Sequence, residues 1–192
     1  LPHTKLVDRD FDILLSLFVS RLMTLAHVAE LHFQGRREAA KKRLQKLKAL
    51  GLIRERPRRA YEPAILYLPV RSAHLLREHG LIEGFPPLPP ESLRRRAEVS
   101  DMTLRHELQV MDVKTAFHRA LRQRSDLCLT RFSTWPALHQ FQAPASGFGE
   151  VPFLMKPDGY LEIVETSDLE NSVRHAFFLE LDRSTESLDT LL

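Results

Sequence analysis

The chain has 192 residues, of which 43% are hydrophobic and 28% are charged, and this composition excludes a wholly disordered protein. No apolar run approaches the roughly 20 residues that a membrane span needs, and the first residues lack the pattern of a signal peptide. Cys128 is the only cysteine, which excludes an internal disulfide and a cysteine-based zinc site. We therefore expect a cytoplasmic protein with no membrane partner.

Charge is distributed unevenly along the chain. Residues 1–99 carry 19 Lys and Arg against 11 Asp and Glu, whereas residues 100–192 carry 9 against 14. Within the first half, residues 36–59 contain 11 basic and 2 acidic residues. The positive electrostatic field of so many basic residues attracts phosphate or an acidic membrane surface. We predict two units with different partners.

Three helices are predicted at the start of the chain. The first is capped by Asp8 or Asp10, and the second by Thr24. The third covers residues 36–50, because Ala40, Leu44 and Leu47 recur at helical spacing and Gly51 follows as a C-terminal cap.

Two strands and a fourth helix complete the first unit. Residues 52–56 and 61–68 are predicted strands, joined by a basic hairpin tip at 57–60, and residues 72–79 form the helix. The order of helix, helix, helix, strand, strand, helix predicts a winged helix-turn-helix over residues 1–83. Residues 84–99 are predicted to be a linker, because four prolines in five residues favour an extended spacer.

Residues 100–192 are predicted to form a smaller, acidic α/β domain. A helix of about 20 residues begins at Ser100 or Asp101, and strands follow at 127–132, 151–155, 160–164 and 176–181. The sheet is expected to be mostly antiparallel or mixed. A helix beginning near Ser184 would run past residue 192, so a domain truncated at its C-terminus is expected. The predicted fold class is α+β.

The polar face of the third helix and the wing are the predicted DNA-binding surface. A recognition helix enters the major groove and a wing contacts the DNA backbone or minor groove. Arginine and glutamine can read base edges, whereas lysine mostly neutralises phosphate. The predicted DNA-binding residues are Arg36, Arg37, Lys41, Lys42, Gln45, Lys46, Arg56, Arg58 and Arg59. A solvated basic face that binds nothing specific is the alternative.

Carboxylates in the second unit raise a separate hypothesis. Glu180 and Asp182 alternate on a predicted strand, so their side chains would share one face. Together with Asp158 they could hold Mg²⁺, with Asp158 and Glu180 as ligands, in a nuclease of the PD-(D/E)xK type. His106 is added as a candidate catalytic residue. The alternative for the carboxylates is that they pair with arginines or backbone amides. The alternative for His106 is a buried histidine with a structural role.

The chain resembles the replication-relaxation family of plasmid and mobile-element proteins. The resemblance rests on the segments His27–Phe33 and Ala39–Leu44, on His106-Glu107-Leu108 followed by Asp112-Val113, on the turn Lys156-Pro157-Asp158-Gly159, and on residues 177–187. The family usually has glycine where Ser184 stands. The resemblance implies a role in plasmid replication initiation or DNA processing, or in regulation on a mobile element.

The sequence therefore favours a binding protein over an enzyme. The predicted function is that of a duplex DNA-binding protein that acts in replication initiation or DNA processing. Two alternatives stay open: a metal-dependent nuclease with a restriction-endonuclease-like second domain, and a winged-helix transcriptional regulator whose second domain senses a ligand or partner. Beyond DNA, the expected partners are a second copy of the chain or other replication and mobilisation proteins.

Overall fold

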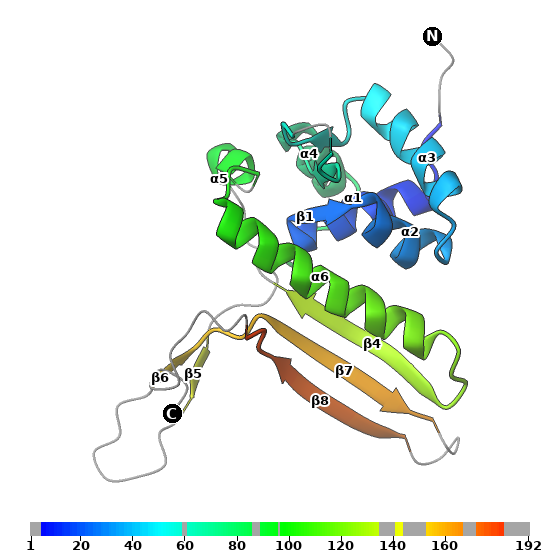
Figure 1. Ribbon diagram of the computed structural model, residues 1–192, viewed down its shortest axis with the longest axis vertical. Helices are drawn as coiled ribbons and strands as arrows, with labels where there is room; N and C mark the ends of the chain where they lie inside the picture. The colour runs from blue at the N-terminus through cyan, green and yellow to red at the C-terminus, as the bar shows by residue number, and fades with distance from the viewer. Residues whose placement is uncertain are drawn as a thin grey trace.

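The computed structural model describes residues 5–58, 61–85, 89–95, 97–134, 141–143, 153–166 and 172–182. Its first half contains α1 (Asp8–Ser20), β1 (Leu22–Thr24), α2 (Leu25–Phe33), α3 (Arg37–Ala49), β2 (Arg54–Glu55), β3 (Ile65–Tyr67) and α4 (Val70–Glu78) (Figure 1). The helices and the paired strands follow the predicted order. The sheet is antiparallel, with the strand order β1-β3-β2, and β1 was not predicted because three residues are too few to show periodicity.

Apolar residues at helical spacing build the core of this half. Ile13, Leu14, Leu17 and Phe18 from α1 are almost fully buried. Ala40, Leu44 and Leu47 form the buried face of α3, as predicted, and pack in the same cluster. Burial of this face holds α3 against the other helices, and the remaining residues, mostly Lys, Arg, Ala and Gln, themselves favour a helix.

Local signals set the ends of the helices. The Thr24 hydroxyl accepts the His27 backbone N–H at 3.3 Å and caps α2, as predicted. Gly51 follows α3 with a φ of +69°, a left-handed conformation that glycine adopts without steric cost. Neither Asp8 nor Asp10 is the N-cap of α1, which is Val7. Asp10 instead accepts the Val7 N–H and pairs with Arg43 inside the fold.

The segment predicted to be an extended spacer contains a helix. Residues Pro90–Arg95 form α5, which packs near α4, and Leu93 is 5% exposed within the first core. Proline is tolerated in the first turn of a helix, where its missing N–H has no acceptor. Burial of Leu93 then outweighs the extended preference of the preceding prolines. The division of the chain into domains stays a prediction.

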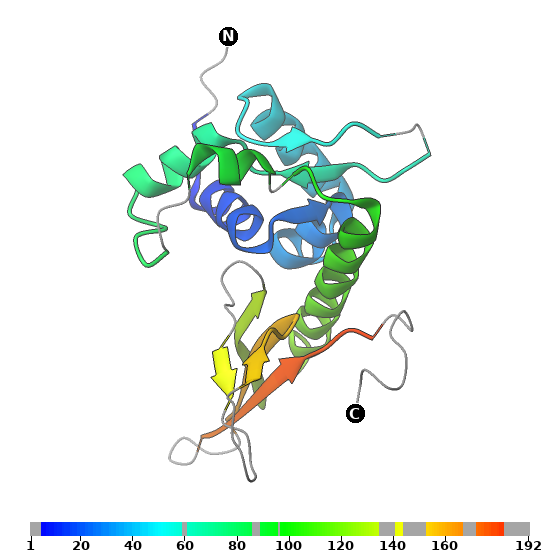
Figure 2. The ribbon, with the colours of Figure 1, turned by 90° about the vertical axis from the view of Figure 1, so that its left-hand side faces the viewer.

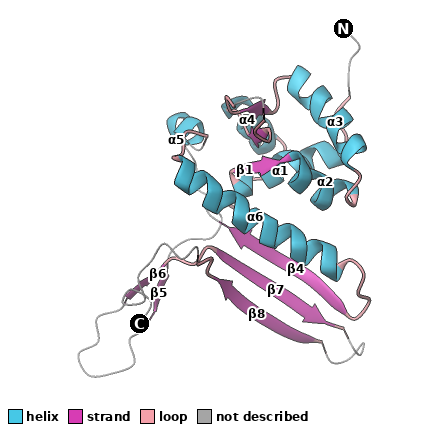
Figure 3. Cartoon of the chain, viewed as in Figure 1, coloured by secondary structure: helices cyan, strands magenta, loops and turns pink. Residues whose placement is uncertain are grey.

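The second half contains one long helix and antiparallel strands (Figure 3). Helix α6 (Asp101–Leu121) begins after Ser100, whose hydroxyl accepts the Thr103 N–H at 3.2 Å. Strands β4 (Leu127–Thr134), β7 (Gly159–Glu165) and β8 (Val173–Leu179) form a sheet in the order β4-β7-β8, and β5 (Phe141–Ala143) pairs with β6 (Phe153–Met155). Every described pair of strands is antiparallel.

Helix α6 lies between the two halves. It packs against α2 and β1 on one side and against β4 on the other (Figures 1 and 2). Helix α1 also contacts β4 directly, and the Thr134 hydroxyl donates to the Val19 carbonyl at 3.4 Å. The buried residues of α6 include Val110, Met111 and Lys114. No helix in the described part of the chain is both long and apolar enough to cross a membrane.

Candidate nucleic-acid interface

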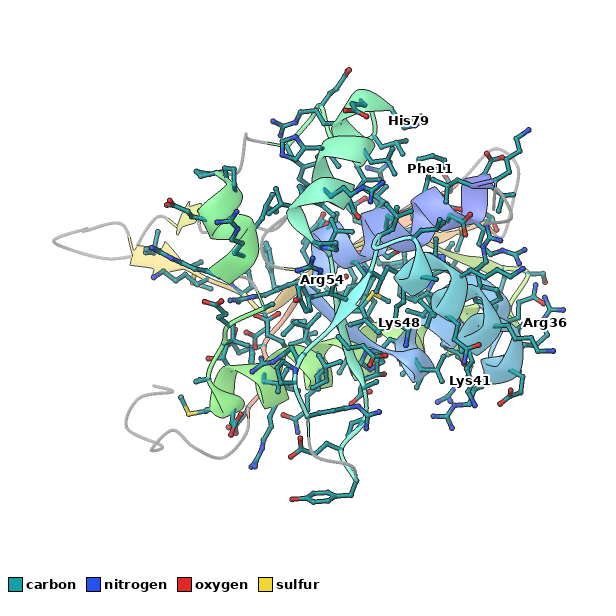
Figure 4. All side chains as sticks on the ribbon, turned by 90° about the horizontal axis from the view of Figure 1, so that it is seen from above. Phe11, Arg36, Lys41, Lys48, Arg54 and His79 are labelled. Carbon is teal, nitrogen blue, oxygen red and sulfur yellow. The ribbon has the colours of Figure 1, made fainter. Side chains whose placement is uncertain are left out.

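The outward face of α3 is a continuous basic surface. All six residues predicted on this face or at its start are exposed: Arg36, Arg37, Lys41, Lys42, Gln45 and Lys46. Arg36 and Lys41 project from α3 at the edge of the molecule (Figure 4). Because Ala40, Leu44 and Leu47 anchor the opposite face, the basic side chains are presented together to solvent.

Two basic residues of α3 that were not among the predicted DNA-binding residues form ion pairs within the protein. Arg43 forms an ion pair with Asp10, which is completely buried, and this carboxylate raises the pKa of the Arg43 guanidinium. The Lys48 ammonium donates to Glu55 at 2.5 Å and links the end of α3 to β2. The charges of these two residues are therefore partly neutralised within the protein.

The predicted wing residues differ in how they are placed. Arg58 is exposed, and its Nη1 donates to the Glu62 carbonyl at 2.7 Å within the hairpin. Arg56 is partly buried at the root of the hairpin, where its Nη2 donates to the Val99 carbonyl at 3.1 Å. Arg56 is thus turned toward the segment before α6 rather than outward at the tip. Arg59 lies outside the described residues. The β2–β3 hairpin itself extends away from the helices (Figure 2).

The structure brings together two of the four candidate catalytic residues. His106 Nε2 on α6 lies 2.7 Å from Asp158 Oδ1, directly before β7. The second Asp158 oxygen accepts the Leu181 backbone N–H at 2.8 Å. Both carboxylate oxygens are therefore engaged, and the contact joins α6 to the chain after β8. This agrees with the predicted alternative of carboxylates held by backbone amides.

Glu180 and Asp182 do not share a strand face, so that expectation was wrong. Strand β8 ends at Leu179, and both residues follow it. Beyond the end of the strand, the Leu181 N–H donates to the Asp158 carboxylate and not to a neighbouring strand. Among the described residues, no three His, Cys, Asp or Glu side chains are grouped so that they could hold a metal ion.

Polar contacts tie α6 to the first half. Glu107 pairs with Arg21 at 3.3 Å, and Asp112 Oδ1 lies 2.8 Å from His27 Nε2. Because the Thr24 N–H donates to His27 Nδ1, the neutral ring carries its proton on Nε2 and donates it to Asp112. Sequence reasoning did not identify these contacts, since the partners lie about 85 residues apart.

A buried lysine with two half-buried histidines nearby lies beside these contacts. The Lys114 ammonium donates to the Ser20 hydroxyl at 3.5 Å and lies 5.7 Å from the centre of the Phe132 ring. Burial lowers the pKa of Lys114 to about 8. Burial, reinforced by the nearby Lys114 charge, also lowers the pKa values of His32 and His118 to about 4. At neutral pH both imidazoles are therefore neutral.

These histidines predict a loss of stability in acid. Between pH values of about 6.5 and 4, the unfolded chain binds protons at His32 and His118 that the folded chain excludes. The free energy of unfolding that the two neutral imidazoles contribute is fully present above a pH of about 6.5. It is lost as the pH falls to about 4. Urea unfolding across this range should show a falling free energy of unfolding. The decline should be shallower in His32→Gln/His118→Gln, and an unchanged decline in that variant would contradict this assignment.

Comparison with known proteins agrees with the resemblance in the sequence. The profile described as Replication-relaxation matches residues 14–192. The chain belongs to the replication-relaxation family. No curated protein matches the chain. A solved structure of a mutant of Lactococcus lactis ZitR is similar at 20% identity, with 63% of this chain and 76% of that chain covered and a TM-score of 0.33.

Helix α6 carries one of the segments on which the resemblance in the sequence rests. The segment that resembles the family motif places His106, Glu107 and Asp112 on this helix. Each of them contacts a different element: His106 reaches Asp158, Glu107 reaches Arg21 and Asp112 reaches His27. In this replication-relaxation protein, the motif therefore joins the helix to both halves of the molecule.

Proposed function

We propose that this replication-relaxation protein binds duplex DNA, in replication initiation or DNA processing on a plasmid or mobile element. Residues 1–83 would act as a winged helix-turn-helix, with α3 as the recognition helix and the β2–β3 hairpin as the wing. The observation that carries the proposal is the exposed basic face of α3, which stands on a helix anchored by a separate apolar face.

The binding mechanism follows from the chemistry of that face. Lys41, Lys42 and Lys46 would neutralise phosphates and release counterions, which supplies affinity without reading sequence. Arg36 and Arg37 at the start of α3 could reach guanine, and Gln45 could reach adenine, in the major groove. Arg58 would contact the backbone from the wing. A palindromic site would indicate a homodimer, with each copy on one half-site.

Selection from a random duplex pool tests whether α3 reads sequence. We expect the full chain to enrich one motif, and Gln45→Ala to relax the preference at a single base position while retaining affinity within about tenfold. This expectation follows because a good bidentate contact discriminates bases by about 1–3 kcal/mol. Enrichment of an identical motif by Gln45→Ala would contradict a reading role for this residue, and a pool with no enriched motif would leave only phosphate binding.

A transcriptional regulator is the second candidate function. The contacts of α6 with Arg21 and His27 connect the second half to the helices that carry α3. A ligand or partner that binds the second half would therefore act on the proposed DNA-binding helix through these contacts. This candidate predicts one tight operator near the gene that encodes the protein. The nuclease alternative stays a prediction of the sequence.

A further inference from the structure

A large pocket lies at the root of the wing, apart from the outward face of α3. It has a volume of about 710 Å³ and is bounded by β2, β3, the start of α4 and α5. This volume is within the range of about 300–1,000 Å³ that is typical of small-molecule sites. The pocket exists because α5, in the segment predicted to be a linker, folds back against the winged-helix half.

Four arginines line this pocket. Arg54 and Arg56 come from the strand side, Arg71 from the first turn of α4 and Arg94 from α5. Among the described residues that line the pocket, Glu98 is the one carboxylate. Three parts of the fold thus bring positive charge to one volume, which raises the local concentration of anions. Arg54 lies near the centre of Figure 4, well away from Arg36 at the far end of α3.

The guanidinium group of Arg56 is partly removed from solvent, unlike the arginines of an exposed basic surface. Its Nη2 donates to the Val99 carbonyl, but its Nη1 is buried and has no hydrogen-bond acceptor among the described residues. A buried guanidinium N–H without an acceptor is costly, and a bound anion is one group that would supply the acceptor. The fold therefore holds a desolvated donor beside a cationic pocket.

The walls of the pocket favour a ligand with an apolar part as well as charge. Tyr67, Pro57 and Pro69 contribute ring surfaces between the arginines. Planar guanidinium groups match phosphate oxygens in pairs of parallel hydrogen bonds. We propose that this pocket is a binding site for phosphate groups carried on a ligand of nucleotide size. The phosphate comes either from a free nucleotide or from a nucleotide unit of bound DNA, and the inference is independent of DNA binding by α3.

The test uses the full chain with ATP, inorganic pyrophosphate and a short duplex as probes. Calorimetric titration should show ATP binding to the wild type that weakens about tenfold or more in Arg54→Gln/Arg94→Gln, because two charge-assisted contacts are lost. The matched control is Lys41→Gln/Lys42→Gln, which removes the same charge from α3 and should leave ATP binding unchanged. Arg54 and Arg94 are exposed, and thermal unfolding verifies that both variants fold.

The outcomes separate the two sources of phosphate. ATP binding that depends on Arg54 and Arg94 supports a free nucleotide. Absence of ATP binding, together with a salt slope of duplex binding that falls by about 2 in Arg54→Gln/Arg94→Gln, supports a phosphate of DNA. ATP binding that is equal in wild type and Arg54→Gln/Arg94→Gln would overturn the proposal, as would neither ATP binding nor a changed slope. If only Lys41→Gln/Lys42→Gln loses duplex binding, the result supports the role proposed for α3 and does not test the pocket.

Discussion

Reversing two charges on α3, with Lys41→Glu and Lys42→Glu, is expected to weaken duplex binding about 100-fold or more. Both side chains are exposed on the helix that we propose enters the DNA, so the change replaces two phosphate contacts with repulsion. The salt slope of the remaining binding should fall by about 2 for the same reason. Fluorescence anisotropy with a labelled duplex measures both quantities.

The fold should survive this substitution, because neither lysine contributes to the core. Circular dichroism is therefore expected to match the wild type. Lys156→Glu with Arg174→Glu is the matched control, since both residues are exposed in the second half and make the same charge change. Their effect on affinity should stay within about threefold, because salt screens exposed charges beyond about 8 Å. Equal weakening by the two pairs would mean that net charge, and not α3, determines binding.

Asp10→Asn is expected to lower the free energy of unfolding by about 3–5 kcal/mol. The Asp10 side chain is completely buried, and it accepts hydrogen bonds from the Arg43 guanidinium and from the Val7 N–H. Asparagine keeps the shape but removes the negative charge, which leaves a partly buried cation without its counterion. Urea unfolding monitored by circular dichroism measures the difference.

Asp12→Asn provides the control on the same helix. Asp12 is exposed, so its substitution should change the free energy of unfolding by no more than about 0.5 kcal/mol. A cost below about 1 kcal/mol for Asp10→Asn would contradict the view that this ion pair fastens α1 to α3. Because Arg43 belongs to α3, Asp10→Asn is also expected to loosen the helix that presents the basic face.

Local patterns were enough to predict most of the helices and which side of α3 is buried. Thr24, Gly51 and Ser100 mark helix ends through backbone chemistry that acts over a few residues, and the 3.6-residue repeat of Ala40, Leu44 and Leu47 separates the buried face of α3 from its basic face. These signals do not depend on distant parts of the chain. The helix ends and the buried face of α3 that rested on them were confirmed, whereas DNA binding by the basic face stays a prediction.

Contacts between distant residues could not be predicted in the same way. The expected strand positions of Glu180 and Asp182 were wrong because β8 ends at Leu179. Beyond that end, the backbone N–H of Leu181 donates to Asp158, which lies more than 20 residues earlier in the chain. Arg56 was assigned to the wing by its position in the sequence, whereas its partner is the carbonyl of Val99. The short helix α5 forms because Leu93 is buried by the first core, which is a tertiary effect that overrides local preference.

Anisotropy of a labelled 30-base-pair duplex across a series of salt concentrations tests the central claim most directly. If about six of the basic residues meet phosphates, log Kd plotted against log salt should have a slope of magnitude about 5, with binding strongest at low salt. The same slope should be retained when Mg²⁺ is replaced by chelator at constant ionic strength. Absence of binding at low salt, or binding that is insensitive to salt, would contradict the proposal that the exposed face of α3 holds duplex DNA.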